Sequence, residues 1–125
     1  VFALVALEAA YSHKEREPWL ASLNTHLKSN IAYLKQFLTT HYPKIKMMEP
    51  EASYLVWLDF RALFDNPVSL KNWLVTQAKL GLNDGAGFSK KPSVGEGFAR
   101  MNIAVPKATL VKACNQLLKA KASLP

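Results

Sequence analysis

The clearest hydrophobic pattern in the chain lies between residues 18 and 41, where apolar side chains recur at steps of three and four. This spacing places them on one side of a helix, so it predicts a long amphipathic helix over about residues 18–41. Pro18 fits the first helical turn, and the helix is expected to end before Pro43. The apolar positions on this face are Leu20, Leu23, Leu27, Ile31, Leu34 and Leu38.

Three further helices are predicted outside this segment. Residues 1–11 are apolar and indicate a helix already under way, so we expect the chain to begin inside a helix of a longer protein. Ser69 can cap a helix that stops at Gly81, and Pro106 opens the last helix. The inward residues of these two helices are expected to be Leu70, Trp73, Leu74 and Ala78, and Leu110, Val111, Cys114, Leu117 and Leu118.

A buried strand is predicted over Tyr54–Phe60, which is rich in aromatic and aliphatic residues. Shorter strands are predicted at Ile45–Met48 and Leu82–Asn83. Residues 85–97 carry four of the five glycines and predict a loop, and a strand follows over Phe98–Val105. Helices mixed with short strands indicate an α/β fold, an α+β two-layer sandwich with helices packed on a small sheet. Such a sheet is too small for a doubly wound nucleotide-binding domain.

Arg100 stands near the head of the last predicted strand. Because side chains alternate along a strand, Arg100 shares one face with Asn102 and Ala104. The other face is apolar and consists of Met101, Ile103 and Val105. A buried arginine needs an anionic partner, and its planar fork matches a carboxylate with two hydrogen bonds. That partner could be a substrate carboxylate or, equally, a carboxylate of the chain: Glu49, Glu51 or Glu96.

The composition is that of an ordinary globular domain, since 50% of the 125 residues are hydrophobic and 20% are charged. The net charge of +7 permits binding to nucleic acid, but the lysines are scattered and only Lys90 and Lys91 are adjacent. Solvated faces without a nucleic-acid partner are therefore favoured, with a basic nucleic-acid-binding module and a free-standing interaction domain as alternatives. No apolar run approaches the roughly 20 residues of a membrane-spanning helix, and no membrane partner is expected.

Few residues offer reactive chemistry. Cys114 is the single cysteine, which excludes an internal disulfide and a multi-cysteine zinc site and suits the reducing cytoplasm. It falls on an apolar helix stripe, so a buried thiol is expected rather than a nucleophile. Asp59 is expected to pair with Arg61 or to cap a turn. No metal site is expected, because the three histidines lack the spacing of helical zinc ligands; they are His13, His26 and His41.

Three runs of sequence together carry a resemblance. They are Pro50–Phe60, Gly85-x-x-Phe88, and Gly95-Glu96-Gly97-Phe98-x-Arg100-x-Asn102-Ile103-Ala104-x-Pro106. The runs resemble the C-terminal part of class I/II aminotransferases, fold type I enzymes that depend on pyridoxal 5′-phosphate (PLP). Within that family they are most similar to the cystathionine β-lyase-like C–S lyases, a branch that carries residues like Trp19, Leu20 and Asn30 at the corresponding places. The resemblance covers nearly the whole chain.

The resemblance implies a two-part organisation of the chain. Residues 1–17 would form the helix and connector that lead from a missing large domain, and residues 18–125 would form the small C-terminal domain. Arg100 matches the family arginine that clamps the substrate α-carboxylate, with Asn102 as a supporting residue. The loop that approaches the active-site mouth would contain Gly85, Gly87 and Phe88.

The resemblance also implies the chemistry of the whole protein. PLP would be bound mainly by the large domain of a homodimeric enzyme that acts on a small-molecule amino acid. No lysine in this chain matches the one that forms the Schiff base with PLP, so no catalytic residue is expected here and the chain alone is expected to be inactive. The parent enzyme would be a C–S β-lyase or an aminotransferase, and the resemblance favours the lyase.

Overall fold

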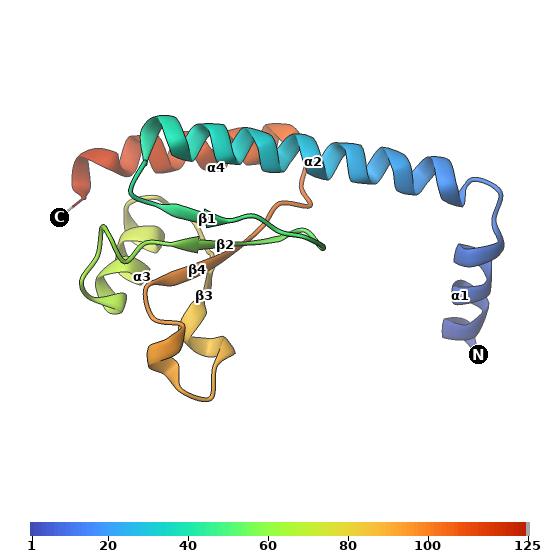
Figure 1. Ribbon diagram of the computed structural model, residues 1–125, viewed down its shortest axis with the longest axis horizontal. Helices are drawn as coiled ribbons and strands as arrows, with labels where there is room; N and C mark the ends of the chain where they lie inside the picture. The colour runs from blue at the N-terminus through green and yellow to red at the C-terminus, as the bar shows by residue number, and fades with distance from the viewer. Residues whose placement is uncertain (125) are drawn as a thin grey trace.

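The fold is built on an antiparallel sheet of four strands (Figure 1). The computed structural model describes residues 1–124. The strands β1 (Lys46–Met48), β2 (Leu55–Asp59), β3 (Asn83–Asp84) and β4 (Phe98–Asn102) lie in the order β1-β2-β4-β3. Strand β4 is therefore interior, paired with β2 on one side and with β3 on the other. Together with the helices, this small sheet confirms the predicted α/β fold class.

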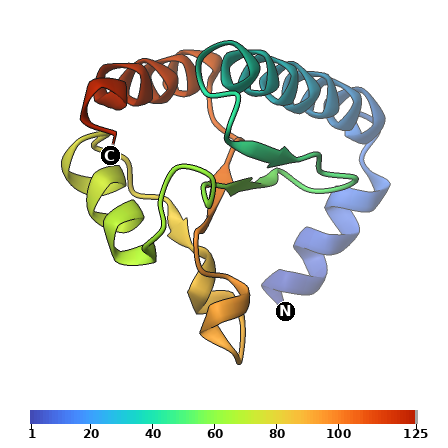
Figure 2. The ribbon, with the colours of Figure 1, turned by 60° about the vertical axis from the view of Figure 1, so that its left-hand side comes forward.

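Helices cover one face of the sheet. Helix α2 (Arg16–His41) and helix α4 (Lys107–Ala120) lie side by side across it (Figures 1 and 2). Helix α3 (Pro67–Thr76) lies beside the β3 edge. Helix α1 (Phe2–Ser12) stands apart from the sheet at the far end of α2 and has no buried residue. Among residues 1–124, no long helix covers the opposite face of the sheet (Figures 1 and 2).

The side chains of β4 alternate between the two faces, as the sequence predicts. Ala99 and Met101 are buried in the core, whereas Arg100 is half-buried and Asn102 is exposed. The buried set continues to Ile103, just past the strand. One face of β4 therefore belongs to the core beneath α2 and α4, and the other carries the arginine.

The apolar faces of α2 and α4 point into the core largely as their spacing predicts. Two expected core residues are nevertheless exposed: Leu20 and Leu118. Leu20 lies on the first part of α2, which extends past the sheet, and Leu118 lies one position around α4 from a buried leucine (Figure 1). The residues that are buried as expected are Leu27, Leu34 and Leu38 on α2, and Leu110, Cys114 and Leu117 on α4.

The prediction that Ser69 caps helix α3 is wrong. The cap is Asn66, whose Oδ1 accepts a hydrogen bond of 2.8 Å from the backbone N–H of Val68. Pro67 then takes the first helical position, where a missing N–H costs nothing. The Asn-Pro pair is thus a stronger start signal than a serine two positions further on.

Two predicted elements also end early. Helix α3 stops at Thr76 instead of Gly81. It cannot continue to Gly81, because Lys79 adopts a positive φ of 56°, outside the range of a right-handed helix. Strand β4 stops at Asn102 instead of Val105. There the Asn102 side chain turns the backbone, its Oδ1 accepting a hydrogen bond from the N–H two residues on.

A buried asparagine on α2 forms hydrogen bonds with the backbone just after β4. Asn30 is fully buried, and its Nδ2 donates to the carbonyl oxygens of Ile103 at 3.0 Å and Val105 at 2.9 Å. One turn earlier on α2, His26 Nε2 also lies 2.9 Å from the Val105 carbonyl oxygen. These carbonyls lie beyond the strand, so α2 partners backbone groups that no neighbouring strand satisfies.

We expect Asn30→Ala to lower the free energy of unfolding by about 2 kcal/mol, because it leaves the buried Ile103 carbonyl oxygen without its donor. Urea unfolding followed by circular dichroism measures this loss. Asn24→Ala is the matched control, since Asn24 is exposed on the same helix. Equal unfolding midpoints for the two variants would show that the buried contacts do not stabilise the fold.

Candidate functional site

Strand pairing builds a row of four side chains across the open face of the sheet. Arg100 on β4 is directly opposite Trp57 on β2 and Asn83 on β3, and Trp57 is opposite Met48 on β1. Paired residues in an antiparallel ladder point to the same face. We call Met48, Trp57, Arg100 and Asn83 the arginine row. The sequence alone indicates Arg100 as a candidate binding residue. The positions of Met48 and Asn83 in the row depend on the register of strand pairing, which only the structure gives.

The Arg100 side chain has no carboxylate partner in the described part of the chain. Its Nε is buried and makes no hydrogen bond. Of the three candidate carboxylates, Glu49 is bound instead by Lys35 at 2.7 Å, and neither Glu51 nor Glu96 forms an ion pair within residues 1–124. The alternative in which a carboxylate of the chain neutralises Arg100 is therefore not what this structure contains.

An aromatic ring from the segment that precedes β4 lies on the guanidinium. The Phe88 ring centroid is 4.1 Å from Arg100 Cζ, a cation–π distance. The same ring meets Trp57 edge-on, with centroids 5.3 Å apart and planes at 87°. The structure thus brings Phe88 and Arg100 together, as expected of a loop that approaches the site.

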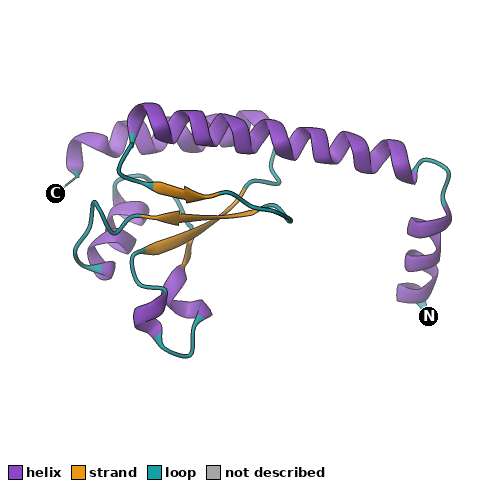
Figure 3. Ribbon diagram, viewed as in Figure 1, coloured by secondary structure: helices purple, strands orange, loops and turns teal. Residues whose placement is uncertain are grey.

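The segment between β3 and β4, which the sequence predicts as a loop, contains regular secondary structure. It contains two short 3₁₀ helices, Gly85–Phe88 and Pro92–Val94, which appear as helical turns in Figure 3. Gly85 and Gly95 let these turns touch, because a Cβ on either one would run into the backbone of the other. Gly87, in contrast, has no atom within 4 Å of a built Cβ. The glycine contact therefore fixes the turn that carries Phe88.

We expect Gly85→Ala and Gly95→Ala each to destabilise the protein by about 1–3 kcal/mol, because the added methyl forces the two turns apart. Thermal unfolding of the two variants against wild type measures the effect. Gly87→Ala adds the same methyl group in open space and should change stability far less. A Gly87→Ala variant as unstable as Gly85→Ala would contradict the role of the contact.

Asp59 fills both roles expected from the sequence: it pairs with the Arg61 side chain, and its Oδ1 accepts a hydrogen bond of 3.0 Å from the Arg61 backbone N–H at the turn after β2. Asp59 accepts hydrogen bonds from Arg61 Nε at 2.9 Å and from a terminal guanidinium nitrogen at 2.8 Å. These hydrogen bonds hold the pKa of the Asp59 carboxyl below its usual value, against the opposing effect of burial. Asp59 is therefore an ionised structural partner and not a proton acceptor for catalysis.

The lowered pKa of Asp59 predicts a pH dependence of stability. The paired carboxylate stabilises the folded state fully above the unfolded pKa of about 3.9, and this contribution disappears as pH falls through the lower folded pKa. Wild type should therefore exceed Asp59→Asn in unfolding free energy near neutral pH and lose that advantage below about pH 4. Urea titrations of both proteins across this range test it, and a pH-independent difference would contradict it.

The remaining candidate residues have structural contacts. Asn102 is exposed and accepts a hydrogen bond of 2.8 Å from the Ala104 N–H, which ends the strand. Cys114 is buried as expected, and burial raises the pKa of its thiol to about 11. Within residues 1–124, no group of three or more acidic, histidine or cysteine side chains has a geometry that could hold a metal.

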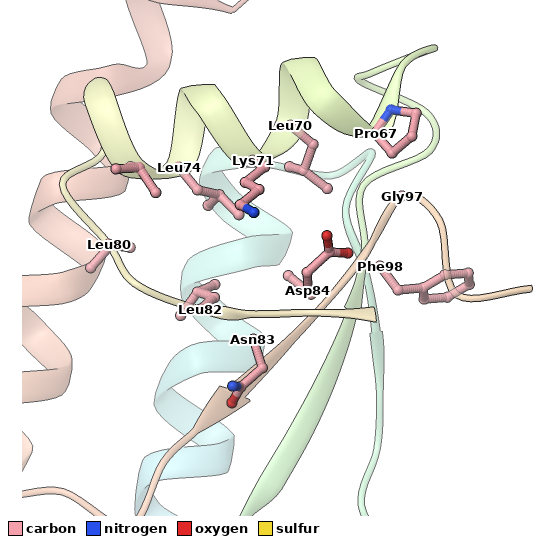
Figure 4. Close-up of a pocket in the computed structure, with 12 residues that line it drawn as sticks. Pro67, Leu70, Lys71, Leu74, Leu80, Leu82, Asn83, Asp84, Gly97 and Phe98 are labelled. Atoms are coloured by element: carbon pink, nitrogen blue, oxygen red, sulfur yellow. The ribbon is translucent and has the colours of Figure 1, made fainter. Parts of the chain in front are cut away.

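A hollow lies between α3 and the strands β3 and β4, and Figure 4 shows its lining. Lys71 and Asp84 are the charged residues that line it. The apolar wall includes Leu70, Leu74, Leu82 and Phe98. Asn83 of the arginine row also lines this hollow, whereas Arg100 does not, so the hollow adjoins the row at its β3 end.

The chain is similar in sequence to parts of longer proteins. No family model matches the chain. Cystathionine β-lyase PatB of Bacillus subtilis (strain 168) is 41% identical to it over 109 residues, which are 87% of this chain and 27% of that protein. Aspartate aminotransferase of Pyrococcus horikoshii is 26% identical over 120 residues, 96% of this chain and 29% of that protein.

Solved structures show the same fold. A PLP-bound protein from Clostridium difficile 630 superposes with a TM-score of 0.85 at 37% identity, over 96% of this chain and 30% of that one. Cystalysin from Treponema denticola, whose crystal structure contains PLP, gives a TM-score of 0.83 at 29% identity, over 93% of this chain and 28% of that one. The chain spans less than a third of the length of any of these proteins.

None of the helices in residues 1–124 combines the length and the hydrophobicity that crossing a lipid bilayer requires.

Proposed function

Because the chain belongs to the fold type I PLP-dependent enzymes, as the C-terminal segment of such a protein, we propose that it binds the substrate carboxylate for a C–S β-lyase. One observation carries this proposal: Arg100 is half-buried on an otherwise structural strand, and no carboxylate of residues 1–124 pairs with it. An amino-acid substrate brings the missing carboxylate. The guanidinium fork can hold both of its oxygens at once.

The cofactor of the proposed enzyme is PLP, held mainly by the part of the protein that this chain does not span. When bound, PLP withdraws electrons from the substrate Cα. The arginine row contains no lysine, and every lysine of the chain is exposed except the half-buried Lys107. Lys107 is already engaged, since its Nζ donates to the Ser29 carbonyl oxygen at 3.2 Å. We therefore propose that the chain supplies carboxylate binding but not covalent attachment, and that alone it is inactive.

The substrate would be an amino acid with a sulfur substituent on Cβ. Arg100 would fix its carboxylate and so orient the Cα that loses a proton. In the lyase the thiol leaves from Cβ, and water then cleaves the C–N bond of the remaining three-carbon enamine, through its imine tautomer, to give pyruvate and ammonia. In an aminotransferase the same carboxylate contact serves, but the amino group is passed on to a keto acid. The identity to PatB favours the lyase, and the match to an aspartate aminotransferase supports the alternative.

We also propose a domain boundary within the first helices. Residues 1–17 would lead from the large domain, and residues 18–125 would form the small one. Helix α1 is strongly apolar and yet buries no residue in the described part of the chain. A helix that is hydrophobic on all sides is normally buried, so α1 is expected to pack within the absent large domain. The homodimer and the cytoplasmic location are proposed from the resemblance to the family.

The experiment that tests the function uses the full-length holoenzyme with L-cystathionine as substrate. Release of both pyruvate and a free thiol is the expected result. A parallel assay with a keto acid measures transfer of the amino group. Amino transfer without thiol release would contradict the lyase and support the aminotransferase. The absence of both activities would contradict both assignments.

In that enzyme we expect Arg100→Lys to raise KM about 10- to 100-fold with a smaller effect on kcat, because an ammonium replaces the two-pronged fork with a single point charge. Arg61→Lys is the matched control, since the carboxylate bound by Arg61 is Asp59 of the same chain. It should leave KM near the wild-type value. An unchanged KM in Arg100→Lys would remove Arg100 from the site.

A further inference from the structure

We propose that Phe88 is a positioning residue for substrate binding: its ring holds one face of the Arg100 guanidinium and leaves the edge free for the carboxylate. This inference rests on the proposed function of Arg100. The observation behind it is the separation of 4.1 Å between Arg100 Cζ and the Phe88 ring centroid. The N–H groups of a guanidinium lie in its plane, so a ring stacked on the face does not block them.

A second arginine of the same chain shows the complete arrangement. Arg61 Cζ lies 4.5 Å from the centroid of the Phe98 ring, and its nitrogens donate two side-chain hydrogen bonds to Asp59. Arginine, phenylalanine and carboxylate thus occur together around Arg61. Around Arg100 the arginine and the phenylalanine are present, and the carboxylate is the missing member. The comparison indicates that stacking and two-pronged carboxylate binding are compatible in this fold.

The position of Phe88 is determined by its own surroundings and not by Arg100 alone. Trp57 contacts the ring edge-on at 5.3 Å, and the close approach of Gly85 and Gly95 fixes the turn. Phe88 as a whole residue is nevertheless 51% exposed, so it contributes little to the core. A ring built into the loop and left open on one side suits the role of holding a guanidinium before substrate arrives, which lowers the ordering cost of binding.

The test compares Phe88→Leu, which keeps an apolar side chain but removes the π face, with Phe88→Tyr, which keeps that face. In the full-length holoenzyme with L-cystathionine, Phe88→Leu should raise KM about 2- to 30-fold, the range of a cation–π contact, and change kcat less. Phe88→Tyr should retain a KM near the wild-type value. If Phe88→Leu does not give a folded holoenzyme, Phe88→Met serves the same comparison.

The same two variants are then measured with Arg100→Gln in the background. If Phe88 acts through the guanidinium, Phe88→Leu should have little further effect on KM once Arg100→Gln has raised it. An unchanged KM in Phe88→Leu, or an equal rise in both backgrounds, would overturn the role of Phe88 while leaving Arg100 in place. An unchanged KM in Arg100→Gln alone would overturn the proposed function and this inference with it.

Discussion

The strict alternation of side chains along β4 is the constraint on which the rest of the structure depends. Ala99 and Met101 must enter the core beneath α2 and α4, and this leaves Arg100 on the opposite face. A slip of one residue in the pairing with β2 would exchange the two sets and drive a guanidinium into the core. Burial of Ala99 and Met101 in the core therefore also determines the face on which Arg100 lies, and no further interaction is needed to place it there.

Arg61, in the turn after β2, and Arg100, on β4, differ in one respect that supports the proposal for Arg100. Arg61 has a ring beneath it and a carboxylate beside it, so its charge is satisfied within the fold. Arg100 has the ring but not the carboxylate, and its Nε is buried without a hydrogen bond. A buried donor without a partner costs free energy in every folded molecule. This lack of a partner is why we propose that a substrate carboxylate binds the guanidinium.

Much of this arrangement can be predicted from sequence, and the exceptions have physical reasons. The leucine spacing of α2 and the two faces of β4 depend only on local periodicity, so both are predictable. The opposition of Met48, Trp57 and Asn83 to Arg100 depends on which strands pair and in what register, which no local pattern encodes. The start of α3 is a different case: asparagine and serine cap helices about equally well, and Pro67 at the first helical position favours Asn66 over Ser69.

Asn30 is a polar residue on the apolar face of α2, and the helical spacing alone does not show what it binds. It falls on the buried stripe of α2 between Leu27 and Leu34, where a polar side chain requires a partner. The partners are carbonyl oxygens that follow β4, 73 and 75 residues further along the chain. No spacing rule predicts a contact of that range. Its effect is to join α2 to the end of the strand that carries Arg100. The helix that connects to α1 and the strand that places the arginine are therefore parts of one hydrogen-bonded unit.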